Sequence, residues 1–142
     1  QHGVERFLAG IAGATYLFCN EDEARLLTGQ VAPEAAIEVL ARAFPVVGIK
    51  LGARGCLCAA GNRRIAVPAV PARPVDSTGC GDAWNAGFLA GMLRGLDLAA
   101  AARLAVWTAA WVVSRPGAVP AGWGAGDRAA AWEYATTGGR QP

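Results

Sequence analysis

Hydrophobic residues along the first third of the chain alternate between helical spacing and short unbroken runs. Apolar residues recur at helical spacing over residues 4–11, and residues 15–19 follow as a short run of β-forming side chains. The same change occurs between residues 33–44, which carry one apolar stripe, and the continuous apolar run 46–50. Such a run is typical of a parallel strand that is covered on both faces. Strands alternating with helices predict a layered α/β fold.

Signals for a further helix lie directly after the first strand. Asn20 ends the strand, the acidic residues 21–23 begin a helix that continues through Leu27, and Gly29 ends it. Acidic side chains suit this position because the N-terminal end of a helix carries partial positive charge. On the sequence alone, the simplest interpretation of Asn20 and Glu23 is helix capping.

The middle of the chain predicts a turn, a hairpin and an extended segment. Residues 51–55 form a turn at the C-terminal end of strand 46–50, which is where open α/β sheets place their ligands. Residues 56–60 and 64–67 read as the two strands of a β-hairpin. The proline-spaced residues 68–74 then lead, without regular structure, into the next helical region.

Two helices are predicted in the second half of the chain. The first covers residues 81–94, and the second is capped by Asp97, continues to Ser114 and is apolar on almost every side. A helix that is hydrophobic all round is usually buried. Trp107 and Trp111, four residues apart on it, are therefore interpreted as core residues rather than as a platform for a nucleotide base.

Composition narrows the class of protein. The chain has 142 residues, 54% of them hydrophobic and 17% charged, with a net charge of +2. These values exclude a disordered chain and give no support for nucleic-acid binding. The apolar window 98–113 is interrupted by Arg103 and is too short for a membrane span, so we expect no membrane partner. With no signal peptide recognised, the expected location is the cytoplasm, with free thiols.

A structural zinc site has almost no support in the sequence. The only histidine is His2, and no two cysteines have Cys-x-x-Cys spacing. The four cysteines are Cys19, Cys56, Cys58 and Cys80.

The candidate chemistry lies in residues 76–84, Asp-Ser-Thr-Gly-Cys-Gly-Asp-Ala-Trp. Gly79 and Gly81 flank the small residue Cys80 where a loop opens into a helix, so backbone N–H groups gather at a helix N-terminus. Such a place attracts phosphate, because the first N–H groups of a helix lack an acceptor and the helix dipole adds positive charge. Asp82 would face that phosphate. A carboxylate beside an anion is costly unless a proton or a metal passes between them, so we expect a catalytic loop.

This stretch closely resembles the second signature of the ribokinase-like (PfkB) sugar kinases. Cys80 stands where alanine is usual in the family, and Trp84 stands where phenylalanine is usual. Three other segments match family elements in the same order: residues 20–23 its Asn-x-x-Glu element, residues 50–55 its nucleotide-side glycine turn, and residues 115–118 the end of its late helix. Family chains are longer, and the part expected before Gln1 carries most sugar contacts and the lid strands.

The resemblance implies a ribokinase-like sheet flanked by helices, incomplete at its N-terminal side, with residues 1–142 as the nucleotide-binding and catalytic C-terminal portion. The implied function is ATP-dependent phosphoryl transfer to a primary hydroxyl of a small sugar or sugar-like molecule. Asp82 would accept the hydroxyl proton. The N–H groups of Gly79, Cys80 and Gly81 would hold the transferring phosphoryl group.

The same resemblance implies further ligand-binding residues. Lys50, Gly52 and Gly55 would bind the nucleotide. Asn20 and Glu23 would hold Mg²⁺ through its water molecules, and Asp76 would help to hold a monovalent cation such as K⁺. An Asp that caps a turn explains Asp76 equally well. Homodimer formation is expected of the complete protein, while the acceptor (fructose, ribose, a keto-deoxy sugar acid or a nucleoside) and the adenine contacts stay open.

Other classes fit less well. A P-loop NTPase is excluded because Lys50 is the only lysine and lies outside a Walker motif, and a Rossmann dinucleotide site is excluded because the third glycine is missing.

Residues 124–127 repeat the Gly-x-Gly-Asp core, but without a preceding strand, so they are interpreted as a helix cap before a helix over residues 128–135. Residues 136–142 are expected to fray. The serious alternative is a truncated half that binds nucleotide without turnover.

Overall fold

The computed structural model describes residues 2–139 of the chain. These residues divide into two compact units. The first contains the chain up to Gly52 together with Cys56–Ala66, and the second contains Ala53–Gly55 and the chain from Val67 onward. No helix in the described part of the chain is long and apolar enough to cross a membrane.

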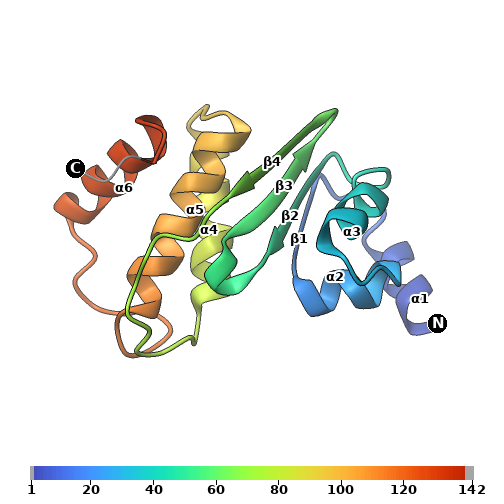
Figure 1. The fold of residues 1–142 in the computed structure, drawn as a ribbon, viewed down its shortest axis with the longest axis horizontal. Coiled ribbons are helices and arrows are strands. Elements are labelled where there is room, and N and C mark those ends of the chain that lie inside the picture. Colours follow the sequence, from blue (N-terminus) through green and yellow to red (C-terminus); the bar gives the residue numbers. More distant parts are fainter. Residues whose placement is uncertain (1, 140–142) are drawn as a thin grey trace. The chain divides into compact units, whose positions relative to one another are not determined.

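The first unit is an α/β layer, as the hydrophobic pattern predicts (Figure 1). Its strands form one sheet in the order β1-β2-β3-β4, with β1 parallel to β2 and β3 antiparallel to β2. The predicted hairpin is β3 and β4, and β4 begins at Arg63, one residue earlier than expected. Its elements are α1 (His2–Gly10), β1 (Tyr16–Asn20), α2 (Glu21–Thr28), α3 (Pro33–Leu40), β2 (Val46–Lys50), β3 (Cys56–Ala60) and β4 (Arg63–Val67), and the 3₁₀ helix η1 (Gly52–Arg54) links β2 to β3.

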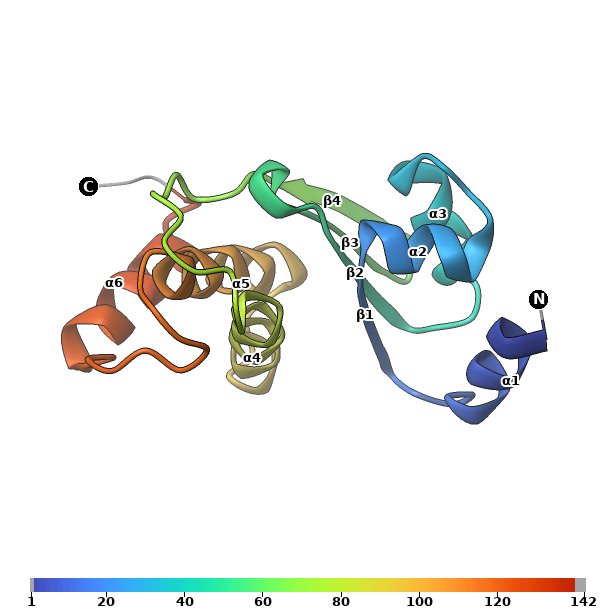
Figure 2. The same ribbon diagram turned by 90° about the horizontal axis from the view of Figure 1, so that it is seen from below.

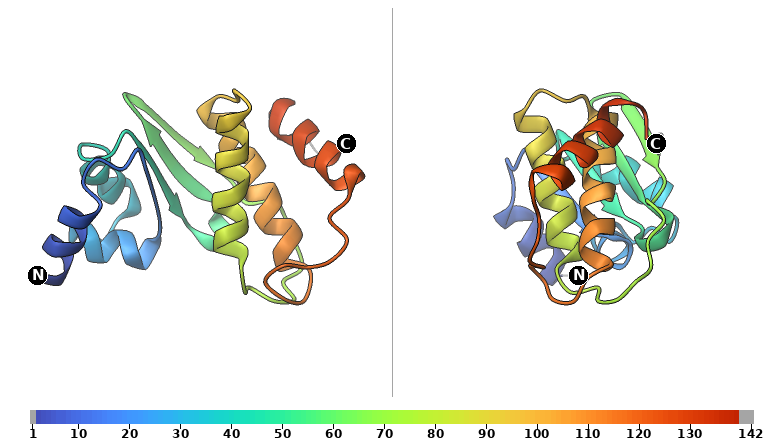
Figure 3. Two further views of the ribbon diagram at one scale, coloured as in Figure 1. Left: turned by 180° about the vertical axis from the view of Figure 1, so that it is seen from behind. Right: turned by 90° about the vertical axis from the view of Figure 1, so that its left-hand side faces the viewer.

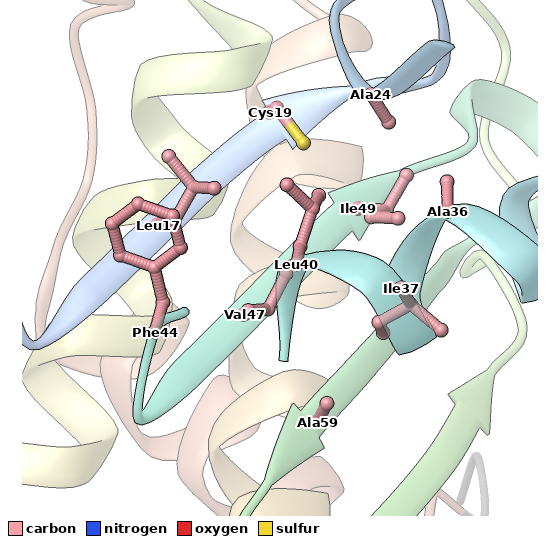
Figure 4. Close-up of a cluster of buried hydrophobic side chains, with 10 residues drawn as sticks. All are labelled: Leu17, Cys19, Ala24, Ala36, Ile37, Leu40, Phe44, Val47, Ile49 and Ala59. Carbon is pink, nitrogen blue, oxygen red and sulfur yellow. The ribbon is translucent and has the colours of Figure 1, made fainter. Parts of the chain in front are cut away.

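The core of this unit lies where α2 and α3 pack on one face of the sheet (Figure 2). Val47 and Ile49 of β2 have no exposed surface, and Leu40 of α3 and Phe44 are also buried (Figure 4). Burying side chains of this size stabilises a fold by roughly 1.5–3 kcal/mol each. The complete cluster is Leu17, Cys19, Ala24, Ala36, Ile37, Leu40, Phe44, Val47, Ile49 and Ala59.

The helix predicted over residues 33–44 is shorter in the structure. α3 ends at Leu40, and the backbone tightens there, because the N–H groups of Arg42 and Ala43 bond three residues back, to Val39 and Leu40. The chain still makes the next turn, since Phe44 N donates to Leu40 O at 3.0 Å. The apolar stripe therefore reaches Phe44 although the regular helix does not.

The second unit is helical and contains α4 (Cys80–Leu93), α5 (Leu98–Val113) and α6 (Ala125–Thr136). α4 and α5 lie side by side, and α6 packs on α5 (Figure 3). Asp97 caps α5 as predicted, since its carboxylate accepts the N–H of Ala100 at 2.8 Å. α5 is the most buried helix of the unit, in agreement with its nearly all-apolar sequence.

Both outer helices of this unit begin earlier than the sequence pattern indicated. α4 starts at Cys80 rather than Gly81, and α6 starts at Ala125 rather than Arg128. α6 also continues to Thr136, and Gly139 N donates to Tyr134 O at 2.9 Å, so hydrogen bonds hold part of the segment that was expected to fray. The rest of that expectation, residues 140–142, lies outside the described residues.

Candidate functional site

The glycine loop (residues 76–82) is held to the end of α5 by backbone hydrogen bonds. The N–H groups of Val75 and Asp76 donate to the carbonyl of Val113, at 2.8 and 3.2 Å. One carboxylate oxygen of Asp76 accepts the N–H of Thr78 at 2.8 Å, and the other accepts the N–H of Gly117 at 2.9 Å. Asp76 therefore joins the loop to the α5 turn (residues 114–118), which follows α5.

These hydrogen bonds also lower the pKa of the Asp76 carboxyl group. The Thr78 side chain, and then the N–H groups of Thr78 and Gly117, hold the pKa of this carboxyl below its ordinary value of 3.8. The carboxylate is therefore ionised at neutral pH. An ionised oxygen pair with two backbone donors caps a turn, and it keeps lone pairs that a monovalent cation could share.

Gly79 is the position at which the loop requires glycine. Its φ is +77°, and a Cβ placed there would lie 2.5 Å from the carbonyl oxygen of Ala118. The left-handed backbone disfavours any other residue, and the α5 turn leaves no room for a side chain. The sequence pattern alone does not distinguish Gly79 from Gly81, whose φ is not positive.

The loop presents backbone N–H groups at the N-terminus of α4. Cys80 N donates to Ser77 O at 3.2 Å, so one of the three expected donors has an intramolecular partner. Within residues 2–139, the N–H groups of Gly79, Gly81 and Asp82 have no such acceptor. Free donors at a helix N-terminus form an anion-binding site.

Asp82 lies in the first turn of α4 and is exposed. Its carboxylate makes no ion pair or side-chain hydrogen bond within the described part of the chain. It is therefore available to a bound molecule. The thiol of Cys80 is less available, because burial and then the Asp76 carboxylate raise its pKa.

A second group of predicted residues lies in the first unit, where β1 and β2 end. The parallel register places Asn20 opposite Lys50, although thirty residues separate them in sequence. Asn20 and Glu23 form a reciprocal capping box, with Glu23 N to Asn20 Oδ1 and Asn20 N to Glu23 Oε2 both at 2.8 Å. The capping interpretation of these two residues is confirmed.

The surroundings of Cys19 show that this end of the sheet is charged. Burial and then the charge of Glu23 raise the pKa of its thiol to about 11, although Lys50 opposes the shift. Both charged groups therefore lie near the C-terminal ends of β1 and β2, the edge at which α/β sheets bind ligands.

The donors present fit magnesium held through water. Within the described residues no group of three or more His, Cys, Asp or Glu side chains could hold a metal ion directly. Mg²⁺ usually keeps several water molecules and needs only one or two carboxylates besides phosphate oxygens. Glu23 Oε1 accepts no hydrogen bond within residues 2–139, so this oxygen could accept one from such a water.

The turn after β2 contains the other predicted nucleotide residues. Gly52 begins η1 and faces open space. Gly55 has a φ of +96°, and a Cβ there would collide with the carbonyl of Val67 and with the backbone of Pro68 and Ala69. The conformation of this turn and its contact with residues 67–69 are enough to explain the glycine at position 55.

The tryptophans of α5 pack against hydrophobic neighbours, but only Trp111 is a buried core residue as predicted, and Trp107 is half-buried. Trp111 is buried, and both Trp107 and Trp111 make edge contacts with Trp123, with ring centroids 5.6 and 4.9 Å apart. The second Gly-x-Gly-Asp sequence is a helix cap, because Asp127 Oδ2 accepts the N–H of Gly124 at 2.8 Å. Its other oxygen accepts the indole N–H of Trp111 at 2.8 Å, a contact that no sequence signal indicated.

The structure thus assembles the predicted residues in two groups. Asp76, Gly79, Cys80, Gly81 and Asp82 share one loop in the second unit. Asn20, Glu23, Lys50 and Gly52 lie in the first unit, where β1 and β2 end, and Gly55 follows in the turn.

Comparison with known proteins identifies the family. The model of the pfkB family carbohydrate kinases matches residues 3–123. The chain belongs to this family. The resemblance carried by the glycine loop, the Asn-x-x-Glu element and the late helix end is confirmed at the level of the family and of its ribokinase-like fold.

Two solved structures and one curated relative show the extent of the similarity. An uncharacterized sugar kinase of Archaeoglobus fulgidus is 35% identical over 108 residues, which are 76% of this chain and 43% of that protein. The adenosine kinase of Sinorhizobium meliloti superposes with a TM-score of 0.78 at 30% identity, covering 85% of this chain and 38% of that one. An Escherichia coli chain named Ribokinase II, in complex with ATP and Mg²⁺, superposes with a TM-score of 0.73 at 27% identity. The match covers 80% of this chain and 37% of that one.

The chain spans less than half the length of the curated relatives that it matches.

Proposed function

We propose that the protein transfers a phosphoryl group from ATP to a primary hydroxyl of a sugar or sugar-like molecule. The observation that carries the proposal is the glycine loop, where free N–H groups of Gly79, Gly81 and Asp82 lie beside an unpaired Asp82 carboxylate at the start of α4. Membership of the carbohydrate kinase family supports it.

Each part of the loop has a role in this reaction. Asp82 orients the attacking hydroxyl and accepts its proton, which leaves late in a loose transition state, so that position matters more than basicity. The N–H groups stabilise the charge that develops on the transferring phosphoryl group. Gly79 and Gly81 contribute free donors, and Cys80 contributes once its long bond to Ser77 opens.

The residues of the first unit serve the nucleotide in this proposal. Lys50, Gly52 and Gly55 bind the nucleotide, and Glu23 with Asn20 orients the waters of Mg²⁺. The ion neutralises charge on the phosphate oxygens when it is bound. The E. coli structure that contains ATP and Mg²⁺ supports these cofactors. Asp76 is proposed to share its carboxylate with K⁺.

The acceptor is proposed to be a small sugar or a nucleoside, since the relatives include a sugar kinase and an adenosine kinase. On the family resemblance alone, we also propose a cytoplasmic location and a homodimer for the complete protein. A second candidate function is nucleotide binding without turnover. The chain's short span relative to its relatives favours that alternative for the chain by itself.

The deciding experiment is Asp82→Asn in the protein expressed from its complete gene. We expect loss of about two to four orders of magnitude in kcat, the usual contribution of a general base, with ATP affinity within a few-fold of wild type. Coupled ADP detection with a panel of acceptors measures the first quantity, and calorimetric titration of ATP measures the second. If the Asn variant kept most of its activity, Asp82 would be only a helix-terminal residue. ATP binding without turnover by the wild type would favour the second candidate.

A further inference from the structure

The glycine loop takes its position from the α5 turn. Asp76 accepts the N–H of Gly117, and Gly79 lies against the backbone of Ala118, where a Cβ would meet the carbonyl oxygen at 2.5 Å. The carbonyl of Val113 accepts the N–H groups of Val75 and Asp76. Any displacement of residues 113–118 therefore moves the backbone donors at the start of α4.

The position of the α5 turn is fixed by contacts between Arg115 and Trp111. The guanidinium carbon of Arg115 lies 3.9 Å from the centroid of the Trp111 ring, so the two groups are stacked. The same guanidinium donates to the carbonyl of Trp111 at 2.9 Å and to the hydroxyl of Ser114 at 3.0 Å. The Trp111 ring thus supplies one of the three contacts that fix Arg115, and with it the turn.

Asp127, sixteen residues along the chain from Trp111, holds that ring. Its Oδ1 accepts the indole N–H at 2.8 Å, while its Oδ2 accepts Gly124 N at 2.8 Å. The helix cap needs only one of the two oxygens. The second oxygen accepts a hydrogen bond from another helix, α5, where the donor is the indole N–H of the buried Trp111. These contacts, and then the charge of Arg115, keep the pKa of Asp127 below its ordinary value, so it is an ionised and therefore strong acceptor.

We propose that Asp127 is a positioning residue for the glycine loop, which it controls through Trp111, Arg115 and the α5 turn. This inference rests on the proposed function for its catalytic consequence. When Asp127 is removed, the indole loses its acceptor and the ring is free to turn. Arg115 then loses its stacking surface, and Gly117 and Ala118 no longer hold Asp76 and Gly79 in place.

The test measures kcat and both KM values in the protein expressed from its complete gene. Asp127→Ala and Trp111→Phe should each lower kcat by about 10- to 100-fold, the loss expected when catalytic groups are misplaced by about 1 Å. The KM of the acceptor should change less than about two-fold, because no acceptor contact is altered. The double variant should be no slower than the worse single variant, since both break one chain of contacts. Arg115→Lys, which lacks the planar stacking group, should show the same loss.

Asp97→Ala is the matched control. Asp97 caps α5 with a bond of the same 2.8 Å length, but it lies at the opposite end of the helix from the α5 turn. It should lower the melting temperature as Asp127→Ala does and leave kcat unchanged. Equal kcat values for Asp127→Ala and Asp97→Ala would overturn the inference, as would fully additive effects in the double variant.

A readout without turnover separates this inference from the proposed function. Backbone amide resonances of Cys80 and Gly117 should shift in Asp127→Ala and Trp111→Phe but not in Asp97→Ala. If the wild type phosphorylates no acceptor, the proposed function fails, and these resonances alone decide whether Asp127 positions the loop. Unshifted resonances would overturn the positioning role even in an active kinase.

Discussion

Gly79 and Gly81 are both glycines of the loop, but the backbone uses them differently. Gly79 has a left-handed φ of +77° and touches the α5 turn, whereas Gly81 lies within the first turn of α4. We expect Gly79→Ala to lower kcat and ATP affinity and to destabilise the protein by more than about 1 kcal/mol, since strain and collision act together. Thermal unfolding and initial-rate kinetics measure both effects.

Two neighbouring variants serve as controls for Gly79→Ala. Cys80→Ala should be nearly silent, because burial and then Asp76 raise the pKa of its thiol, and the family uses alanine there. Gly81→Ala should preserve stability, since alanine favours a helix, and lose activity only if phosphate approaches that backbone closely. A large loss of activity in Cys80→Ala would show that the thiol itself takes part.

The lowered pKa of Asp76 predicts how the stability of the protein depends on pH. Its folded-state pKa is lowered, so its stabilising effect is complete above the ordinary value of 3.8 and is lost as the pH falls through the lower, folded-state value. Asp76→Asn keeps only one acceptor oxygen for two donors. The difference in melting temperature between wild type and Asp76→Asn should therefore be constant at neutral pH and shrink below about pH 4. A difference that grew on acidification would contradict the assignment.

At the level of elements, the capping box of α2 performs a structural task at a position expected to bind magnesium. Asn20→Ala should cost about 1 kcal/mol of stability, because Glu23 N loses its acceptor. Glu23→Gln keeps an oxygen that can accept Asn20 N but removes the charge. We expect Glu23→Gln to leave the melting temperature nearly unchanged and to raise the Mg²⁺ concentration needed for half-maximal activity. Unchanged Mg²⁺ dependence would reduce Glu23 to a cap.

The elements that the sequence predicted well are those with a local cause. The capping box, the left-handed Gly29 and the Asp97 cap all depend on residues within four positions of each other. The α/β layer follows from the change of hydrophobic period at Thr15 and Val46. Element ends were less predictable: the turn after Leu40 continues the apolar stripe of α3 without its regular hydrogen bonds.

The contacts that position the candidate site could not be read from the sequence. Asp76 meets Gly117 across 41 residues, and Asp127 of α6 meets the indole of Trp111 of α5, sixteen residues away. Periodicity reports which face of an element is buried, not which side chain lies opposite. The need for glycine at position 79 could not be predicted from the sequence either, since only the path of the α5 turn shows why a Cβ is excluded there.

At the scale of the whole molecule, the chain contains two compact units, each with buried side chains of its own. The sheet of the first unit has β1 and β4 as outer strands, and no further strand pairs with β1 in the described part of the chain. An outer strand offers unpaired N–H and C=O groups to other chains. The curated relatives are more than twice as long as the segment they share with this chain.

We expect the 142-residue chain, expressed by itself, to fold at least in part but not to phosphorylate a sugar. The buried cluster around Val47 and Ile49 and the packing of α4 on α5 supply cores for folding. Turnover requires more, because positioning supplies most of the catalysis in phosphoryl transfer. Asp82 is the one residue of this chain with a proposed role toward the acceptor, and the others serve the nucleotide, its ions or the transferred group. The outer position of β1 in the sheet should also favour self-association. Light scattering measures the oligomeric state, and coupled ADP detection with and without sugars or nucleosides measures turnover. Acceptor-stimulated ADP release from a monomer would show that these 142 residues hold an acceptor in line with ATP unaided.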